Sequence, residues 1–283
     1  MFSLHEIGNG ADYRFVCDKD LTFSFERKDL IAWRTDTDGF QMKALTADRR
    51  MFVKSQAVIS GLRMDDWAVE VIASDLCRQL GIPCVQQQPC MFLYAGHRYR
   101  GVCSANFELD GDIFLSFERL LERHGLSTRE EDFIHLDSLS KLYWCAERLS
   151  DISKLPEEDT LKYVLDLAVL DCLTGNVDRH TRNFGLFYHA VESKYRIPLI
   201  FDNGMGLFEH DPYRDQYQSF EEAMRSVYVA PYGEDPFELL ELLDHEFDLA
   251  RRYPGLRQLH YPDLLRKPFV LEYERRMIER WQR

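Results

Sequence analysis

Acidic and amide side chains are grouped in two short stretches of the sequence. In the first stretch Asp178 and Asn183 lie five residues apart, and in the second Asp202 precedes Asn203-Gly204. One carboxylate can orient and deprotonate a hydroxyl group, while an amide oxygen and a second carboxylate can hold Mg²⁺ on nucleotide phosphates. The chemistry that suits this set is phosphoryl transfer, with Asp178 as the base and Asn183 and Asp202 as metal ligands.

The elements around these stretches are expected to bring them together. The apolar, helix-like run 161–173 is followed by a helix termination signal that contains Gly175. Two short apolar runs, 184–188 and 197–201, then lie on either side of a polar middle, and this pattern predicts a hairpin. The hairpin would carry the second stretch back beside the first.

A second group of candidate residues lies upstream, in a region of strand-like runs. Gly39 ends a polar loop, and Gln41 and Lys43 follow it. Backbone N–H groups of such a loop can bind phosphate oxygens, although an exposed hairpin turn has the same pattern. Lys54 closes an apolar strand and Glu70 lies in a helix-like run. Active kinases use a helix glutamate to keep a lysine on the phosphates, whereas the alternative is two solvated charges.

The order of these motifs resembles the HipA-like serine/threonine protein kinases of bacteria, in a short form without the family's extra N-terminal subdomain. The matching stretches are Asp38-Gly39-Phe40-Gln41-Met42-Lys43, Phe52-Val53-Lys54, Asp66 to Glu70, Asp178-x-His180-x-x-Asn183 and Ile200 to Gly204. One position departs from the family pattern, because Asp38 stands where the phosphate loop calls for Ser. A carboxylate there would repel phosphate.

The resemblance implies an α+β, two-lobed protein-kinase-like fold. A sheet-rich, nucleotide-binding N-lobe would span residues 1–105 and a helical C-lobe 106–283, with the hinge that grips adenine at 103–107. ATP and Mg²⁺ are the implied cofactors. The residues expected to bind the nucleotide are Gly39, Gln41, Lys43, Lys54, Glu70 and His180.

Three side chains in or beside the Asp178–Asn183 stretch have more than one interpretation. His180 either contacts phosphate or holds the backbone of its loop. Arg179 and Arg182 either neutralise the acidic cluster, contact phosphate or point into solvent, and Asp66 is interpreted as a first-turn helix acid.

The implied activity is transfer of the γ-phosphoryl group of ATP to a Ser or Thr hydroxyl of a protein, with autophosphorylation conceivable. The family also suggests a toxin or effector role and an antitoxin-like regulator. Two other functions stay open. The stretch Asp178-Arg179-His180-x-x-Asn183 is also similar to the catalytic loop of phosphatidylinositol kinases, and Asp38 would suit a nucleotide-binding pseudokinase or regulatory module.

Composition limits the partners and the compartment. The 283 residues carry a net charge of −13, so no direct binding of nucleic acid is expected. The seven cysteines include no C-x-x-C pair, which indicates reduced thiols rather than a zinc site. We see no signal peptide, membrane span or basic membrane anchor, and we therefore expect a cytoplasmic protein, or an effector secreted without a visible signal.

Overall fold

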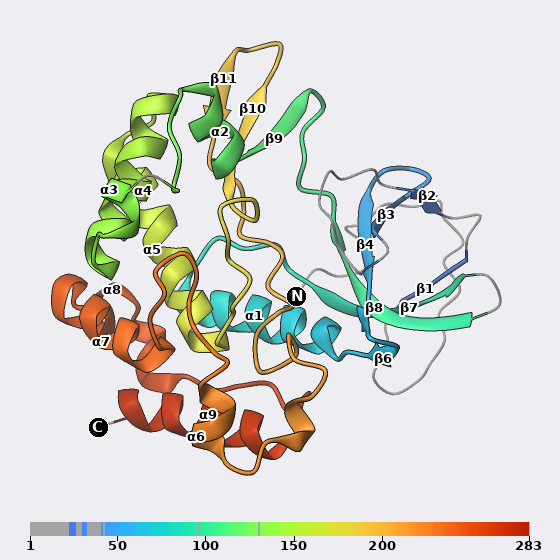
Figure 1. Ribbon diagram of the computed structural model, residues 1–283. Coiled ribbons are helices and arrows are strands. Elements are labelled where there is room, and N and C mark those ends of the chain that lie inside the picture. The colour runs from blue at the N-terminus through green and yellow to red at the C-terminus, as the bar shows by residue number, and fades with distance from the viewer. Residues whose placement is uncertain are drawn as a thin grey trace.

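The computed structural model describes residues 23–26, 30–32, 41, 43–94, 97–129 and 131–282. A β-sheet lies on one side of the molecule and most of the helices lie on the other (Figure 1). Among the described helices, none is long and apolar enough to cross a lipid bilayer. The cysteines in the described part of the chain are buried free thiols.

Six described strands form the large sheet, in the order β1-β7-β8-β4-β3-β2. Their bounds are Phe23–Glu26 (β1), Leu30–Ala32 (β2), Lys43–Thr46 (β3), Met51–Ser55 (β4), Gln88–Tyr94 (β7) and His97–Ala105 (β8). The neighbours are antiparallel except for β1 and β7. Lys43 pairs with Lys54 across β3 and β4, so both side chains project from the same face of the sheet. A small hairpin of β5 (Val58–Ile59) and β6 (Leu62–Arg63) follows β4.

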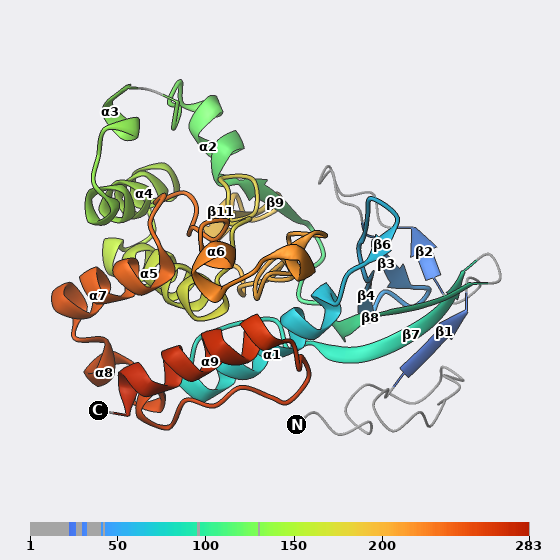
Figure 2. The ribbon, with the colours of Figure 1, turned by 60° about the horizontal axis from the view of Figure 1, so that its bottom comes forward.

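Helix α1 (Asp66–Leu80) lies between the large sheet and the helical part (Figure 2). It ends at Gly81, which has the left-handed conformation (φ 70°) that glycine adopts without strain. Its apolar side chains, among them Ile72 and Leu76, belong to the buried core shared with the helices. The helix is therefore a fixed connection between the two parts of the molecule.

The helical part is built around α5 (Glu157–Thr174), which is buried almost all round from Tyr163 onward, as its sequence predicts. Gly175 ends α5 in the left-handed conformation (φ 58°), so the predicted termination is confirmed. The other helices are α2 (Phe117–Arg123), α3 (Glu131–Ile134), α4 (Ser138–Ser153), α6 (Phe220–Met224), α7 (Pro236–Phe247), α8 (Leu249–Arg252) and α9 (Pro268–Trp281), with 3₁₀ turns η2 (Arg214–Gln216) and η3 (Pro254–Gln258).

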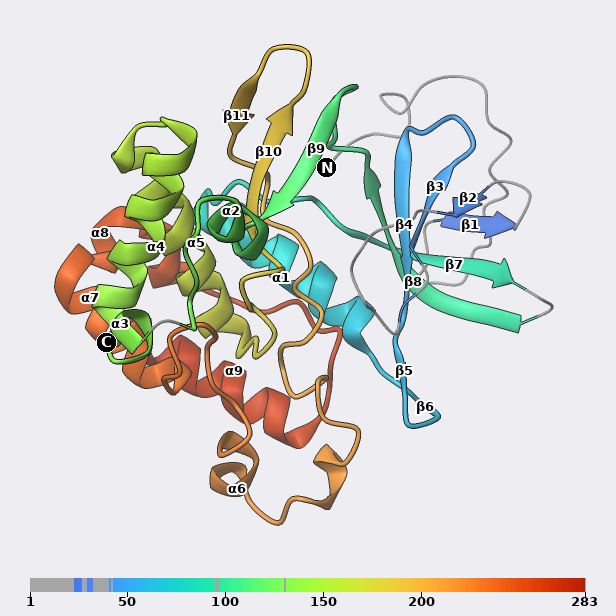
Figure 3. The same cartoon turned by 45° about the horizontal axis from the view of Figure 1, so that its top comes forward.

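The hairpin predicted after the loop is present, but its second strand was placed wrongly. Strand β10 (Gly185–His189) pairs with β11 (Lys194–Arg196), not with 197–201, and on its other side with β9 (Asp112–Ser116) (Figure 3). His189 pairs with Lys194, so the turn between the two strands consists of residues 190–193. The chain then leaves the sheet at Pro198, which has no N–H to donate. The segment 197–201 instead continues to an isolated bridge between Ile200 and Cys84.

The chain leaves the large sheet after Ala105 at the end of β8. The proposed hinge residues 103–105 are thus still part of β8, and the backbone N–H of Asn106 donates to the carbonyl of Arg50. The division into lobes at residue 105 and the adenine-binding role of the hinge stay predictions.

Candidate active site

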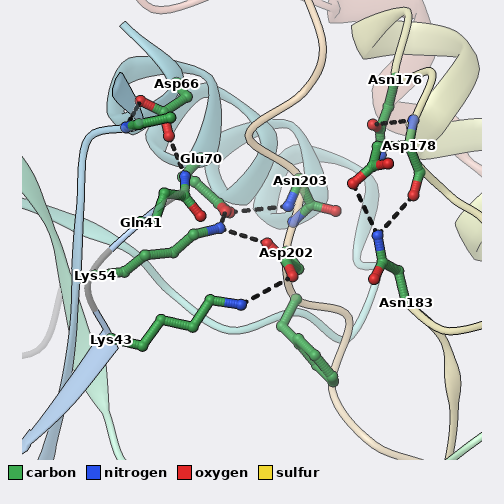
Figure 4. Close-up of polar contacts among 12 residues, drawn as sticks. Gln41, Lys43, Lys54, Asp66, Glu70, Asn176, Asp178, Asn183, Asp202 and Asn203 are labelled. Atoms are coloured by element: carbon green, nitrogen blue, oxygen red, sulfur yellow. Dashed lines mark hydrogen bonds and ion pairs between the residues drawn. The ribbon is translucent and has the colours of Figure 1, made fainter. Parts of the chain in front are cut away.

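A buried lysine lies at the centre of the site (Figure 4). The Nζ atom of Lys54 donates to Oε1 of Glu70 at 2.6 Å and also bonds Oδ1 of Asp202. Lys54 is only 5% exposed. Burial disfavours its charge, but the carboxylates of Asp202 and Glu70 outweigh burial and raise the pKa of Lys54 above its ordinary value. The lysine is therefore a fixed cation within the site.

The Asp202 carboxylate is shared between two lysines. Lys43 reaches its second oxygen, with 3.4 Å between Nζ and Oδ2. Burial would raise the pKa of Asp202, but the charges of Lys54 and Lys43 lower it well below its usual range. The Asp202 carboxylate is therefore ionised at neutral pH.

The backbone after Asp202 is held against α1. The N–H of Asn203 donates to Oε2 of Glu70 at 3.1 Å. A Cβ atom on Gly204 would lie 3.3 Å from both Cβ and the carbonyl oxygen of Asp66. A side chain at position 204 would therefore press on the first turn of α1, which explains the glycine. Glu70 thus links the lysine to the segment that carries Asp202.

The loop after α5 presents Asp178 and Asn183 together. Asn183 Nδ2 donates to the carbonyl oxygen of Asp178 at 2.7 Å and to its Oδ2 at 2.9 Å. Asn176 caps the loop, because its Oδ1 accepts from the N–H of Asp178 at 3.1 Å. The Asp178 side chain is 46% exposed, so its carboxylate is accessible to a substrate hydroxyl. The Asn183 amide uses its nitrogen on Asp178, which leaves its oxygen as the donor atom for a metal.

His180 and Arg182 lie on the outer side of this loop. His180 Nε2 is 3.5 Å from Oδ1 of Asp178, and its Nδ1 accepts from the N–H of Arg182 at 3.2 Å. These contacts favour the loop-holding interpretation of His180, and its contact with nucleotide stays a prediction. The Arg182 side chain is 60% exposed, and its Nε lies 3.9 Å from Glu118. Of the three interpretations of Arg182, the structure therefore favours a side chain that points into solvent.

The sequence left three interpretations of Arg179 open and did not place it among the site residues, yet its guanidinium is hydrogen-bonded on several sides. It is 2% exposed and pairs with the fully buried Asp171 of α5 at 3.0 Å. Its Nη1 donates to the carbonyls of Asn183 (3.3 Å) and Phe201 (3.0 Å). The segments of Asn183 and Asp202 are thus adjacent, as predicted, and an arginine binds both. A detectable signal was that Asp171, like Asp166, is a carboxylate within the largely apolar run 161–173.

The phosphate-loop residues are only partly described. Gln41 Nε2 donates to Oδ2 of Asp66, whose Oδ1 accepts from the N–H of Ala57 at 2.9 Å. Asp66 lies in the first turn of α1 as expected, yet it is 1% exposed and binds other segments instead of solvent. The predicted residue Gly39, and Asp38 beside it, lie outside the described residues.

Solved structures with a similar fold include a kinase. The proinflammatory kinase CtkA of Helicobacter pylori is 14% identical over 92% of this chain and 93% of that chain, with a TM-score of 0.56. The chain has a protein-kinase-like fold. A second structure is HipA of Shewanella oneidensis MR-1 with HipB and operator DNA, 18% identical over 88% of this chain and 65% of that chain, with a TM-score of 0.43. No protein-family description and no curated protein sequence matches the chain.

The predicted α+β, two-lobed kinase-like fold is confirmed by the similarity to CtkA. Figure 4 shows the described candidates in two adjacent groups: Gln41, Lys43, Lys54, Glu70 and Asp202 in one, and Asp178 and Asn183 in the other. His180 lies beside Asp178. Their chemical roles stay predictions.

The side-chain oxygen atoms available in this site suit Mg²⁺. Asp202 supplies an ionised carboxylate and Asn183 an amide oxygen, and both are hard oxygen ligands. Among the described residues, no three His, Cys, Asp or Glu side chains are arranged as a metal site by themselves. A metal held here would therefore need further oxygens, which nucleotide phosphates can supply.

Proposed function

We propose that the protein is an ATP- and Mg²⁺-dependent protein kinase of HipA-like type, which transfers the γ-phosphoryl group to a Ser or Thr hydroxyl. The observation that supports this proposal is that two clusters of polar side chains lie next to each other. The ion cluster of Lys54, Glu70 and Asp202 adjoins the Asp178–Asn183 pair, because one arginine binds both segments.

Each residue has a defined task in this reaction. Lys54 and Lys43 bind phosphate oxygens, and Glu70 keeps the Lys54 ammonium in the site. Asn183 and Asp202 would hold Mg²⁺, which supplies charge neutralisation on the phosphates when bound. Asp178 orients the acceptor hydroxyl and takes its proton as the new O–P bond forms and ADP departs. The loop contacts of Asn176 and Asn183 hold Asp178 for this step.

Replacement of the proposed base tests the proposal. Asp178→Asn should lower Mg²⁺-dependent transfer from radiolabelled ATP by about 10²- to 10⁴-fold, because Asn cannot accept the proton. The measurement is label in protein substrate or in the chain itself, together with intact mass after incubation with Mg-ATP. Asp151→Asn is a matched control, since Asp151 lies on α4 and its side chain is 62% exposed. Equal transfer by wild type and Asp178→Asn would contradict the role of Asp178.

The same assay separates the other functions. Label in phosphoinositide rather than protein would identify a lipid kinase. Binding of ATP without any transfer would identify a pseudokinase or regulatory module.

The proposal also includes a toxin or effector role and an antitoxin-like regulator, both of which rest on the sequence resemblance. It includes a cytoplasmic location, which rests on the composition. The absence of direct nucleic-acid binding rests on the net charge of −13 alone, and a gel shift with duplex DNA tests it.

A further inference from the structure

The guanidinium of Arg179 contacts the segments of both proposed metal ligands. Its Nη1 donates to the backbone carbonyl of Asn183 itself and to that of Phe201, which precedes Asp202. Its Nη2 donates to Oδ1 of Asn203, which follows Asp202, at 2.5 Å. The arginine therefore binds the backbone of one proposed metal ligand, Asn183. It also binds the residues immediately before and after the other one, Asp202.

The arginine is itself fixed by α5. Asp171 accepts from Nε of Arg179 at 3.0 Å and from Nη2 at 3.1 Å. The same carboxylate accepts from Nδ2 of Asn176 at 2.8 Å, and Asn176 in turn caps Asp178. The Asp171 carboxylate, on a buried helix, therefore fixes the position of the proposed base through Asn176. It fixes the two metal-ligand segments through Arg179.

A buried ion pair of this kind is a costly way to stabilise a fold. Removing two charges from water is unfavourable, and replacing such a pair by well-packed apolar side chains of similar size is often neutral for stability. Arg179 and Asp171 are 2% and 0% exposed. What the guanidinium offers beyond stability is a planar set of donors that reaches several acceptors at fixed angles, which an ammonium cannot reproduce.

We propose that Arg179 is a positioning residue that sets the separation of Asn183 and Asp202 and thereby the affinity of the site for its divalent cation. The inference rests on the proposed function, because it assumes that these two residues hold the metal. Arg179 itself is not proposed to contact substrate. Its effect passes through Asn183, Phe201 and Asn203.

The test is divalent-cation binding by Arg179→Lys, which keeps the charge opposite Asp171 but loses the planar donors. Mn²⁺ is titrated into the protein with a non-hydrolysable ATP analogue, and free Mn²⁺ is followed by electron paramagnetic resonance. We expect Mn²⁺ affinity to fall about 10- to 100-fold, as for other groups that orient metal ligands. The Mg²⁺ concentration for half-maximal transfer should rise by a similar factor, while the affinity for the metal-free nucleotide stays within about twofold.

Two further variants make the result specific. Arg182→Lys makes the same change in the same loop at an exposed side chain, and it should leave Mn²⁺ affinity unchanged. Asn203→Ala removes one acceptor of Arg179 and leaves the Asp171 pair intact, so it should fold even if Arg179→Lys does not. Asn203→Ala should weaken Mn²⁺ binding several-fold.

The outcomes separate the two proposals. Wild-type protein without Mg²⁺-dependent transfer would overturn the proposed function. If wild type transfers phosphate and a folded Arg179→Lys or Asn203→Ala binds Mn²⁺ with wild-type affinity, the positioning role of Arg179 is wrong and the kinase assignment stands. An equal loss in Arg182→Lys would also overturn the inference.

Discussion

At the scale of single residues, Asp66 has an unusual environment for a helix-starting acid. Its carboxylate is buried between the first turn of α1, the N–H of Ala57 and the amide of Gln41. Burial raises the pKa of Asp66 from its ordinary 3.8 to about 6, although Lys54 and the two hydrogen bonds oppose this effect. The folded protein thus holds this proton more tightly than the unfolded chain does.

This shift predicts a pH dependence of stability. Since the folded-state pKa is the higher one, the unfolded chain loses the proton first, and Asp66 lowers the free energy of unfolding as pH rises from about 4 to about 6. Asp66→Asn should therefore be more stable relative to wild type at pH 7 than at pH 4, by up to about 3 kcal/mol. Urea unfolding of both proteins across this range measures the difference. A pH-independent difference would contradict the prediction.

At the scale of elements, α1 must be held in place because it carries Glu70. The fully buried Glu209, on the segment after Asp202, accepts from the N–H of Asp65 at 2.7 Å, just before α1. Glu209 also pairs with Arg214 at 3.1 Å and with Lys267 at the start of α9. One carboxylate therefore joins α1, the segment after the metal ligand and α9.

Glu209→Gln should loosen this junction. It removes the charge that two cations share, and we expect the free energy of unfolding to fall by about 2 kcal/mol. Amide hydrogen exchange in the first turns of α1 should become faster, because the helix start loses its anchor. Glu192→Gln in the β10–β11 turn is the control, since the Glu192 side chain is 61% exposed. Unchanged exchange in α1 would show that Glu209 does not hold the helix.

At the scale of the whole molecule, the protein carries a net charge of −13 and is proposed to bind an anionic nucleotide. Lys54 and Lys43 are the cations proposed to bind the phosphates, but Glu70 and Asp202 already pair with them. The site as a whole therefore has little net positive charge with which to attract free ATP. The divalent cation has to supply much of that attraction.

Removal of divalent cations should accordingly weaken nucleotide binding. We expect the affinity for a fluorescent ATP analogue to fall roughly tenfold or more in EDTA compared with millimolar Mg²⁺, because the carboxylates repel the phosphates. Titration at constant ionic strength measures this difference. Equal affinity in both conditions would mean that the lysines alone bind the phosphates.

The amino-acid sequence by itself determined the local features of the protein. The spacing of Asp178 and Asn183, the glycine that ends α5 and the strand that carries Lys54 all depend on neighbours along the chain, where covalent geometry limits the outcome. The order of these motifs was enough to predict a kinase-like fold.

Only the tertiary structure decided how these pieces are held. Arg179 looked equivalent to Arg182 in the sequence, yet one is buried against Asp171 and the other is exposed. Asp66 likewise differs from an ordinary helix acid only through contacts with Gln41 and Ala57. The strand expected at 197–201 was wrong because β10 pairs with Lys194–Arg196, while Ile200 forms a bridge with Cys84, which is distant in sequence. Burial and partners depend on residues distant in sequence, and a local pattern does not fix them.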